Sequence, residues 1–202
     1  MSATRFSGQI EDFLQLALQY GVSSIGRSDA AIRLEAVTRQ DFSERPAQVQ
    51  APKRNIVGGK PGEQKRKGRE AMSLVSLGLC GFNYRLVLLF QIDADATAHA
   101  FFGGDEVQAS LSEFVNLVCG SLNRSLQRAY PSTGMSTPFS MSGTCFGHLS
   151  ILRPDLSATL SFLIGGNIRL RIAYALSVDK RFGFVENAPV EETASMGELE
   201  LF

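Results

Sequence analysis

A carboxylate and an amide stand three positions apart in the middle of the chain, at Glu113 and Asn116. A carboxylate can hold a cationic side chain, and an amide can accept one hydrogen bond while it donates another. On a helix, residues three apart share a face, so both groups could meet one partner. Ala109, Gly120 and Asn123 fall on the same face at helical spacing, and the first two have almost no side chain. A partner's backbone could therefore approach this face closely, although an ordinary solvated helix face is the alternative.

The surrounding residues predict the helix that would position this pair, over residues 105–130. Asp105 follows two glycines and precedes Gln108 by three, a pattern typical of an N-cap with a capping-box partner. Apolar residues then recur at helical spacing, which predicts one buried face opposite the pair. They are Leu111, Val115, Val118, Leu122 and Leu126.

A proline follows the Glu113/Asn116 pair at a spacing that also occurs in a known protein family. Pro138 comes 22 positions after Asn116, in the sequence STP that is expected to open a strand. The arrangement resembles the CheC/CheX/FliY family of chemotaxis phosphatases, whose signature is Asp or Ser, three residues, Glu, two residues, Asn, and a later proline. The likeness covers roughly residues 72–178, including GLCGFNYRLVLLF, LSEFVNLVCGSLN and GMSTPFSMSG. Ala109 departs from it, because the family has Asp or Ser there.

The N-terminal helix repeats part of this signature. Ser7 and Glu11 have the family spacing, but Leu14 stands where Asn should be, and no proline follows at the right distance. The first copy would then be disabled, and the single-site CheX-like branch is the closer match. The alternative is a plain amphipathic helix that matches by chance.

The resemblance implies a function for the candidate residues. It implies hydrolysis of the aspartyl phosphate of a CheY-like response regulator, with Asn116 orienting the water and Glu113 docking the partner. Ala109, Gly120 and Asn123 would form the partner-binding surface. The chain would need no cofactor of its own, because the Mg²⁺ is carried by the phosphorylated partner. CheX-like proteins also pair as homodimers, and an exposed strand edge would be a natural contact.

Two other classes of function stay open. A non-catalytic module of the same fold could bind a signalling partner, which Ala109, the disabled first copy and a long insertion favour. A nucleic-acid-associated protein could use the basic stretch over residues 43–71, which has eight basic and three acidic residues. Two observations argue against binding of nucleic acid: the formal net charge is zero, and the basic stretch has no aromatic residue to stack on bases.

Composition indicates a single globular domain over residues 1–202, with 44% hydrophobic and 20% charged residues. We find no signal peptide and no apolar run long enough for a membrane span, so we expect a cytoplasmic protein without membrane insertion. Three cysteines without metal-like spacing are expected to be small buried hydrophobes. Two distant histidines make a zinc site or a His-based triad improbable.

The element order predicts an α+β fold, a two-layer antiparallel sheet with helices packed on it. Residues 1–42 should hold a helix that Ser7 caps and Gly21 ends, and a strand over 31–38. Residues 43–71 form a basic loop insertion, and the core follows over 72–178. The expected core strands cover 72–80, 84–92, 137–143, 158–164 and 167–177. A short helix, capped by Asp93 or Asp95 and reaching Phe102, should follow the second of these strands.

Residues 179–202 form an acidic C-terminal tail that ends in SMGELELF. One interpretation is a frayed terminus or a final strand. The other is a tethered peptide that captures the regulator, because a short linker raises the local concentration to roughly the millimolar range.

Overall fold

The computed structural model describes residues 2–41, 72–93, 95–102 and 107–185. Three α-helices, one 3₁₀ helix and seven strands make up this part of the chain. In chain order they are α1 (Ser2–Ser24), β1 (Ile32–Asp41), β2 (Met72–Cys80), β3 (Tyr84–Asp93), α2 (Ala96–Phe102), α3 (Val107–Ala129), β4 (Gly134–Met135), β5 (Phe139–Met141), η1 (Gly143–Leu152), β6 (Leu156–Ile164) and β7 (Ile168–Val178).

The strands form one antiparallel sheet in the order β1-β6-β7-β3-β2-β4, and β5 also pairs with β2. The chain runs twice through a helix followed by strands, as α1-β1-β2-β3 and as α3-β4/β5-β6-β7. The first strands of each half pair with the other half: β1 pairs with β6, while β4 and β5 pair with β2. The two halves meet at the central β3–β7 pair. The α+β sheet with helices packed on it confirms the fold class expected from the sequence.

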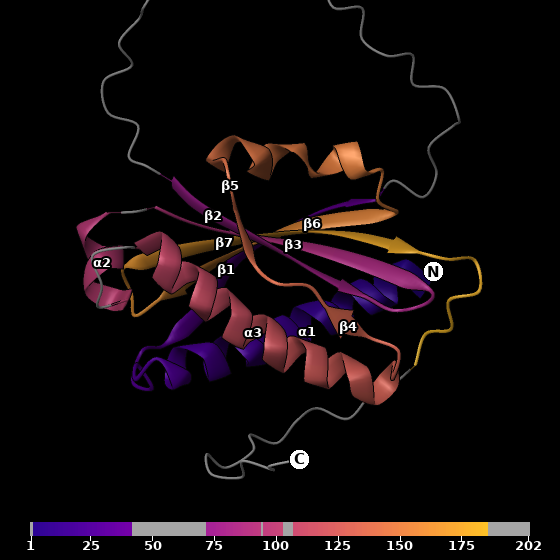
Figure 1. Cartoon of the computed structure of the whole chain (residues 1–202), viewed down its shortest axis with the longest axis horizontal. Helices are drawn as coiled ribbons and strands as arrows, with labels where there is room; N and C mark the ends of the chain where they lie inside the picture. The colour runs from indigo at the N-terminus through magenta and orange to yellow at the C-terminus, as the bar shows by residue number, and fades with distance from the viewer. Residues whose placement is uncertain (1, 42–71, 94, 103–106, 186–202) are drawn as a thin grey trace, which may run out of the picture.

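Helices α1 and α3 cover one face of the sheet (Figure 1). They run antiparallel, because Phe6 near the start of α1 contacts Tyr130 after the end of α3, while Gly21 lies against Phe114 and Val118. Their apolar faces and the facing strand residues form the main core, in which Leu14, Phe90 and Phe162 are fully buried. Buried apolar surface between two helices and a sheet therefore fixes where α3 lies.

The other face of the sheet carries η1, which the sequence did not predict (Figure 1). Strand β5 ends at Met141, so the strand expected over 137–143 is much shorter and gives way to a 3₁₀ helix. Phe146 and Leu149 of this helix pack on Leu74 and Leu89, which form a second, small core. Such contacts between distant segments are not visible in local sequence periodicity.

The prediction for the first helix was wrong at both ends. Ser7 is not an N-cap, because α1 already begins at Ser2 and Ser7 is fully buried inside it. Gly21 does not end the helix, which continues to Ser24; Gly26 at φ +76° follows the last turn and suits a helix stop. A β-carbon on Gly21 would lie 2.6 Å from Val118 Cγ2, so this glycine lets α1 approach α3.

Both predicted hairpins and the cap of α2 are confirmed. Gly165 and Gly166 have φ of +59° and +79° and join β6 to β7. Gly81 donates its N–H to the carbonyl of Tyr84 at 3.0 Å between β2 and β3. Asp95, one of the two residues proposed as the cap, accepts the N–H groups of Thr97 and Ala98, both at 2.9 Å. The insertion over 43–71, the proposed cap at residue 105 and the tail after residue 185 lie outside the described residues.

The cysteines follow the prediction only in part. Cys119 is buried, and burial raises the pKa of its thiol. Cys145 is half-buried, and Cys80, at the end of β2, is exposed. All three are free thiols, so Cys80 is not the buried hydrophobe that we expected.

Candidate functional site

Helix α3 has the two faces that its sequence predicts. The five apolar residues expected to be buried are all fully buried in the core, and Phe114 joins them. On the opposite face, Ala109, Glu113 and Asn116 are exposed, while Gly120 and Asn123 are half-buried. The predicted site residues therefore share one solvent-facing strip of a helix whose other side is rigidly packed.

The fold leaves the side chains of Glu113 and Asn116 unused. Within the described part of the chain, neither forms a hydrogen bond or an ion pair. Two turns of α3 thus present a carboxylate and an amide to solvent without an internal partner. A surface acid and amide without a partner among the described residues are available for contact with another molecule.

Side chains at both ends of α3 attach it to the neighbouring strands. Gln108 donates from Nε2 to the carbonyl of Leu74 at 3.3 Å and to Ser140 Oγ at 3.0 Å. Gln127 donates to the carbonyl of Thr133 at 2.9 Å. Gln108 therefore bridges α3 to β2 and β5, and the capping-box role predicted for it stays a prediction because Asp105 lies outside the described residues. These contacts hold the helix that carries the site against the edge of the sheet.

Pro138 lies at an irregularity in the edge of the sheet beside α3. Met135 pairs with Leu79 and Phe139 pairs with Ser76, so β4 and β5 have one residue more than the facing stretch of β2. Proline lacks an N–H and is tolerated at such an edge bulge. The strand predicted to open at the proline does begin at Phe139, directly after it. Pro138 therefore shapes the edge that supports α3, and it does not lie on the Glu113/Asn116 strip.

Gly120 is not required by the packing of the fold. A β-carbon at Gly120 would meet only Arg124 Nη1, at an ordinary 3.8 Å, and no left-handed φ is recorded there. A glycine inside a helix lowers stability by roughly 0.5–1 kcal/mol relative to alanine. Its neighbour on the strip, Asn123, has a buried Oδ1 that accepts no hydrogen bond within the described residues. Both positions are thus suboptimal for stability alone.

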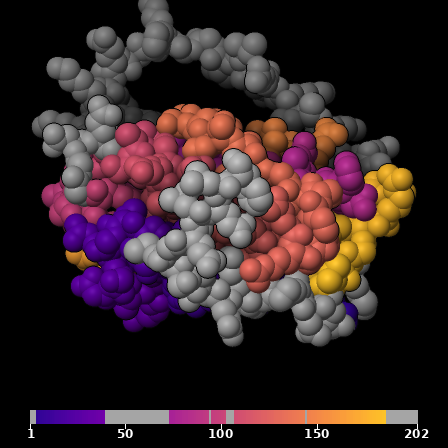
Figure 2. Space-filling model, turned by 60° about the horizontal axis from the view of Figure 1, so that its bottom comes forward, coloured from indigo at the N-terminus to yellow at the C-terminus, as the bar shows by residue number. Residues whose placement is uncertain are grey.

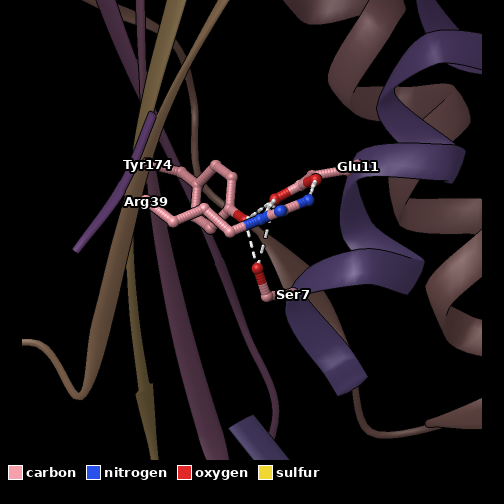
Figure 3. A network of polar contacts seen from close by, with 4 residues as sticks. All are labelled: Ser7, Glu11, Arg39 and Tyr174. Carbon is pink, nitrogen blue, oxygen red and sulfur yellow. Dashed lines mark hydrogen bonds and ion pairs between the residues drawn. The ribbon is translucent and has the colours of Figure 1, made fainter. Parts of the chain in front are cut away.

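The partial signature in α1 is not a surface site. Ser7, Glu11 and Leu14 all face the sheet and are buried. Figure 3 shows Ser7 and Glu11 meeting Tyr174 and Arg39 in a polar network between α1 and the strands. Tyr174 donates to Glu11 Oε1 at 2.7 Å, and Arg39 bonds both carboxylate oxygens. Ser7 and Glu11 therefore form no surface site, which agrees with either a disabled copy or a chance match, and these residues instead attach the helix to the sheet.

The residues of α1 that correspond in burial to Glu113 and Asn116 are Asp12 and Gln15. Both are exposed, and the fully or almost fully buried Phe13 and Leu14 lie between them, as Phe114 and Val115 do in α3. Asp12 and Gln15 are therefore a carboxylate and an amide on the exposed face of α1, at the same spacing as Glu113 and Asn116 on α3.

The site is a helix surface and not a cavity. The two best-defined hollows among the described residues, of about 380 and 200 Å³, contain no residue of α3. Among the same residues, no group of three or more His, Cys, Asp or Glu side chains is arranged to hold a metal ion. None of the helices in the described ranges is long and apolar enough to cross a membrane. The exposed strip is therefore suited to contact with a macromolecule.

Comparison with known proteins identifies the fold. Neither a protein-family model nor a curated protein sequence matches the chain. The crystal structure of the chemotaxis protein CheX from Vibrio vulnificus is similar with a TM-score of 0.53 at 13% identity, over 84% of this chain and 99% of that one. A CheC-like superfamily protein from Shewanella sp. PV-4 gives a TM-score of 0.53 at 10% identity, over 83% and 97%. A chemotaxis protein CheX from Desulfovibrio desulfuricans gives 0.51 at 10% identity, over 84% and 99%. The chain therefore has a CheX/CheC-like fold.

Proposed function

We propose that this chain is a CheX-like phosphatase that hydrolyses the aspartyl phosphate of a CheY-like response regulator. The observation that carries the proposal is the pair Glu113 and Asn116, which α3 presents to solvent with no partner in the described part of the fold. The spacing of the pair resembles the signature of the CheC/CheX/FliY phosphatases. A fold shared with chemotaxis proteins CheX supports the same assignment.

Asn116 is assigned the role of orienting the attacking water. Hydrolysis of a phosphoryl group needs a water in line with the bond that breaks, and little covalent assistance. A neutral amide can accept a hydrogen bond from that water and donate a second one without repelling the phosphoryl oxygens. Holding one water in place is expected to accelerate hydrolysis about a hundredfold, or about 3 kcal/mol of barrier.

Glu113 is assigned the role of a docking group. A carboxylate next to the phosphoryl oxygens would suffer like-charge repulsion, so it is better suited to bind a lysine of the regulator. This contact would set the register of α3 against the partner, one turn away from Asn116. The Mg²⁺ of the reaction belongs to the phosphorylated regulator and is part of the substrate.

The small residues around the pair fit the approach of another protein. Ala109 and Gly120 have almost no side chain, and they lie about one turn before Glu113 and one turn after Asn116 on the exposed strip. With Asn123 they form the proposed partner-binding surface. A flat strip lets α3 slide beside the regulator's active site until Asn116 reaches the phosphoryl group.

A non-catalytic module that binds a signalling partner is the second candidate. The observation that favours it is Ala109, which is exposed on the strip where the resembling family has Asp or Ser. A module of this kind would use the same surface and would leave the rate of hydrolysis unchanged.

Dephosphorylation of a panel of phosphorylated response regulators tests the proposal. The wild-type chain should accelerate the loss of phosphate, and Asn116→Ala should abolish the acceleration while binding is retained. Glu113→Ala should weaken binding and turnover together, because it removes a docking contact.

Asp12→Ala and Gln15→Ala are matched controls, since they also remove a carboxylate and an amide from an exposed helix face, but on α1 and outside the proposed site. Both controls should keep wild-type activity. Equal rates for the wild type and Asn116→Ala on a regulator that binds the chain would reject catalysis and leave the binding module.

A further inference from the structure

The last described residue, Val185, is held by hydrogen bonds on the face of the molecule that α1 and α3 cover. The N–H of Val185 donates to the hydroxyl of Tyr130 at 3.1 Å, and its carbonyl accepts from Gln9 Nε2 at 3.4 Å. Phe182 stacks on Tyr130 with ring centroids 5.5 Å apart, and it also contacts Phe6. The segment that follows residue 185 therefore starts between the first turns of α1 and the last turn of α3.

The segment and this face have complementary charge. Residues 186–202 contain five glutamates and no lysine or arginine. Exposed cations near this point include Lys180 and Arg181 before the segment, Arg5 on α1, and Arg124 and Arg128 on α3. The acidic residues of α1 and α3 in that region are Asp12 and the buried Glu11. Figure 2 shows this face, with α1 in indigo and α3 in salmon. An acidic segment is thus attached beside arginines.

The face also offers apolar surface to the end of the segment. Leu16 is 40% exposed, and the half-buried ring of Tyr20, one turn away, lies under the guanidinium of Arg124, 5.4 Å from its centre. The last residues of the chain include the apolar Leu199, Leu201 and Phe202, with Glu200 between the two leucines. Acidic and apolar side chains of the segment match a surface on which Arg124 lies over Tyr20, one turn from the exposed Leu16.

The length of the segment matches the distance to the candidate site. Asn116 lies 13 residues before the end of α3, which is about 20 Å at 1.5 Å per residue. A chain of 17 residues has a root-mean-square span of about 23 Å, and it can reach roughly 58 Å when extended. Every position on this face up to Asn116 is therefore within reach.

We propose that residues 186–202 dock onto the α1–α3 face of their own chain, with glutamates against Arg124 and Arg128 and the terminal apolar residues on Leu16 and Tyr20. A docked segment would lie across Gly120 and Asn123, next to Asn116. This consequence rests on the proposed function: the segment would compete with the response regulator for the partner-binding surface. Competition is the opposite of the capture role that the tail's sequence suggests.

A tryptophan at the C-terminus tests the docking without any regulator. The chain contains no tryptophan, so Phe202→Trp places the only one at the end of the segment. In the full chain its emission should be blue-shifted and protected from acrylamide, compared with a free peptide of residues 186–202 carrying the same change. Arg124→Glu combined with Arg128→Glu should return both readings to those of the free peptide, and so should high salt, which screens exposed charges.

Arg33→Glu combined with Arg169→Glu is the matched control, because it makes the same change in net charge at two arginines of β1 and β7 that are 72% and 64% exposed. This variant should keep the blue-shifted emission. Arg124→Gln with Arg128→Gln replaces the charge reversal if that variant fails to unfold cooperatively. Free-peptide emission in the full chain, or equal effects of the two charge reversals, would overturn the proposal. A blue shift that disappears on dilution would place the segment on a second copy and overturn docking within one chain.

The kinetic consequence is measured separately. Removal of residues 186–202 should lower KM for the phosphorylated regulator several-fold and leave kcat unchanged. A raised KM would support capture and contradict competition. If no regulator is hydrolysed at all, the proposed function fails, whereas the fluorescence result still decides whether the segment docks.

Discussion

Arg39 and Glu11 form a two-point ion pair that joins the edge strand β1 to the buried side of α1. Arg39 Nε lies 2.9 Å from Glu11 Oε1, and Arg39 Nη2 bonds the other carboxylate oxygen. Burial alone would raise the pKa of Glu11. The carboxylate is stabilised more strongly by hydrogen bonds from Arg39, Tyr174 and Ser7 and by the charge of Arg39, so its pKa lies below the ordinary value. Tyr174 remains a protonated donor because burial raises its own pKa.

The two partners of this pair are expected to differ in their effect on stability. Arg39→Met leaves a buried carboxylate without its cation and should lower the free energy of unfolding by about 2–4 kcal/mol, less than a fully buried pair because Arg39 is 51% exposed. Glu11→Gln leaves a half-exposed guanidinium in water and should cost about 1–2 kcal/mol. Urea unfolding at neutral pH measures both. Arg33→Met is the control on the same strand; Arg33 is 72% exposed, so the loss of its ion pair with Glu35 should cost under about 0.5 kcal/mol.

The same pair predicts a pH dependence. A carboxyl whose pKa is lowered by folding contributes stability above its unfolded pKa, near 4.5, and loses that contribution as pH falls toward its folded pKa. The difference in unfolding free energy between wild type and Glu11→Gln should therefore be full at pH 7 and shrink below about pH 4.5. Urea titrations at a series of acidic pH values measure it. A difference that is constant over this range would mean that Glu11 is not the group responsible.

A third prediction contrasts two glycines of α1. Gly21→Ala should destabilise the protein by about 1–3 kcal/mol, because the new methyl group would lie 2.6 Å from Val118 Cγ2 and 3.1 Å from the ring of Phe114. Gly8→Ala meets nothing within 4 Å and should stabilise by about 0.5–1 kcal/mol through helix propensity alone. Thermal unfolding of both variants gives the signs. Equal signs would show that α1 and α3 are not in close contact at Gly21.

Sequence periodicity was sufficient for elements whose signal is local. The apolar spacing of α3 placed Glu113 and Asn116 on the exposed face, and Gly165-Gly166 specified the β6–β7 hairpin. In both cases the side chains that determine the structure are neighbours in the chain, so pattern and geometry agree.

The errors concern residues whose role depends on a distant partner. Ser7 is typical of an N-cap, yet its hydroxyl shares a hydrogen bond with Tyr174 at 2.6 Å. Gly21 is typical of a helix end, yet it serves a helix contact. Only the tertiary structure brings these partners together, so no local rule could assign them.

Assembly is a fourth prediction, and it concerns the homodimer that the family resemblance implies. Strand β1 forms one edge of the sheet in the described part of the chain, ten residues long. A bulge at Glu35 and the charges of Arg33 and Arg39 disfavour pairing along it. A dimer through this edge should therefore be weak and dissociate on dilution. Light scattering over a concentration series measures this, and a single monomer mass at tens of micromolar would contradict the expected homodimer.

The last prediction concerns Gly120, where stability and binding should change in opposite directions. Gly120→Ala should raise the free energy of unfolding by roughly 0.5–1 kcal/mol, because the new methyl group meets only Arg124 Nη1 at 3.8 Å and the helix gains propensity. If the strip must approach a regulator's backbone closely, the same methyl group should weaken regulator binding. Denaturant unfolding and binding titration of one variant measure both effects, with Gly8→Ala as the control that stabilises α1 away from the strip. A stabilised Gly120→Ala variant with wild-type affinity would show that the partner does not contact α3 at this position.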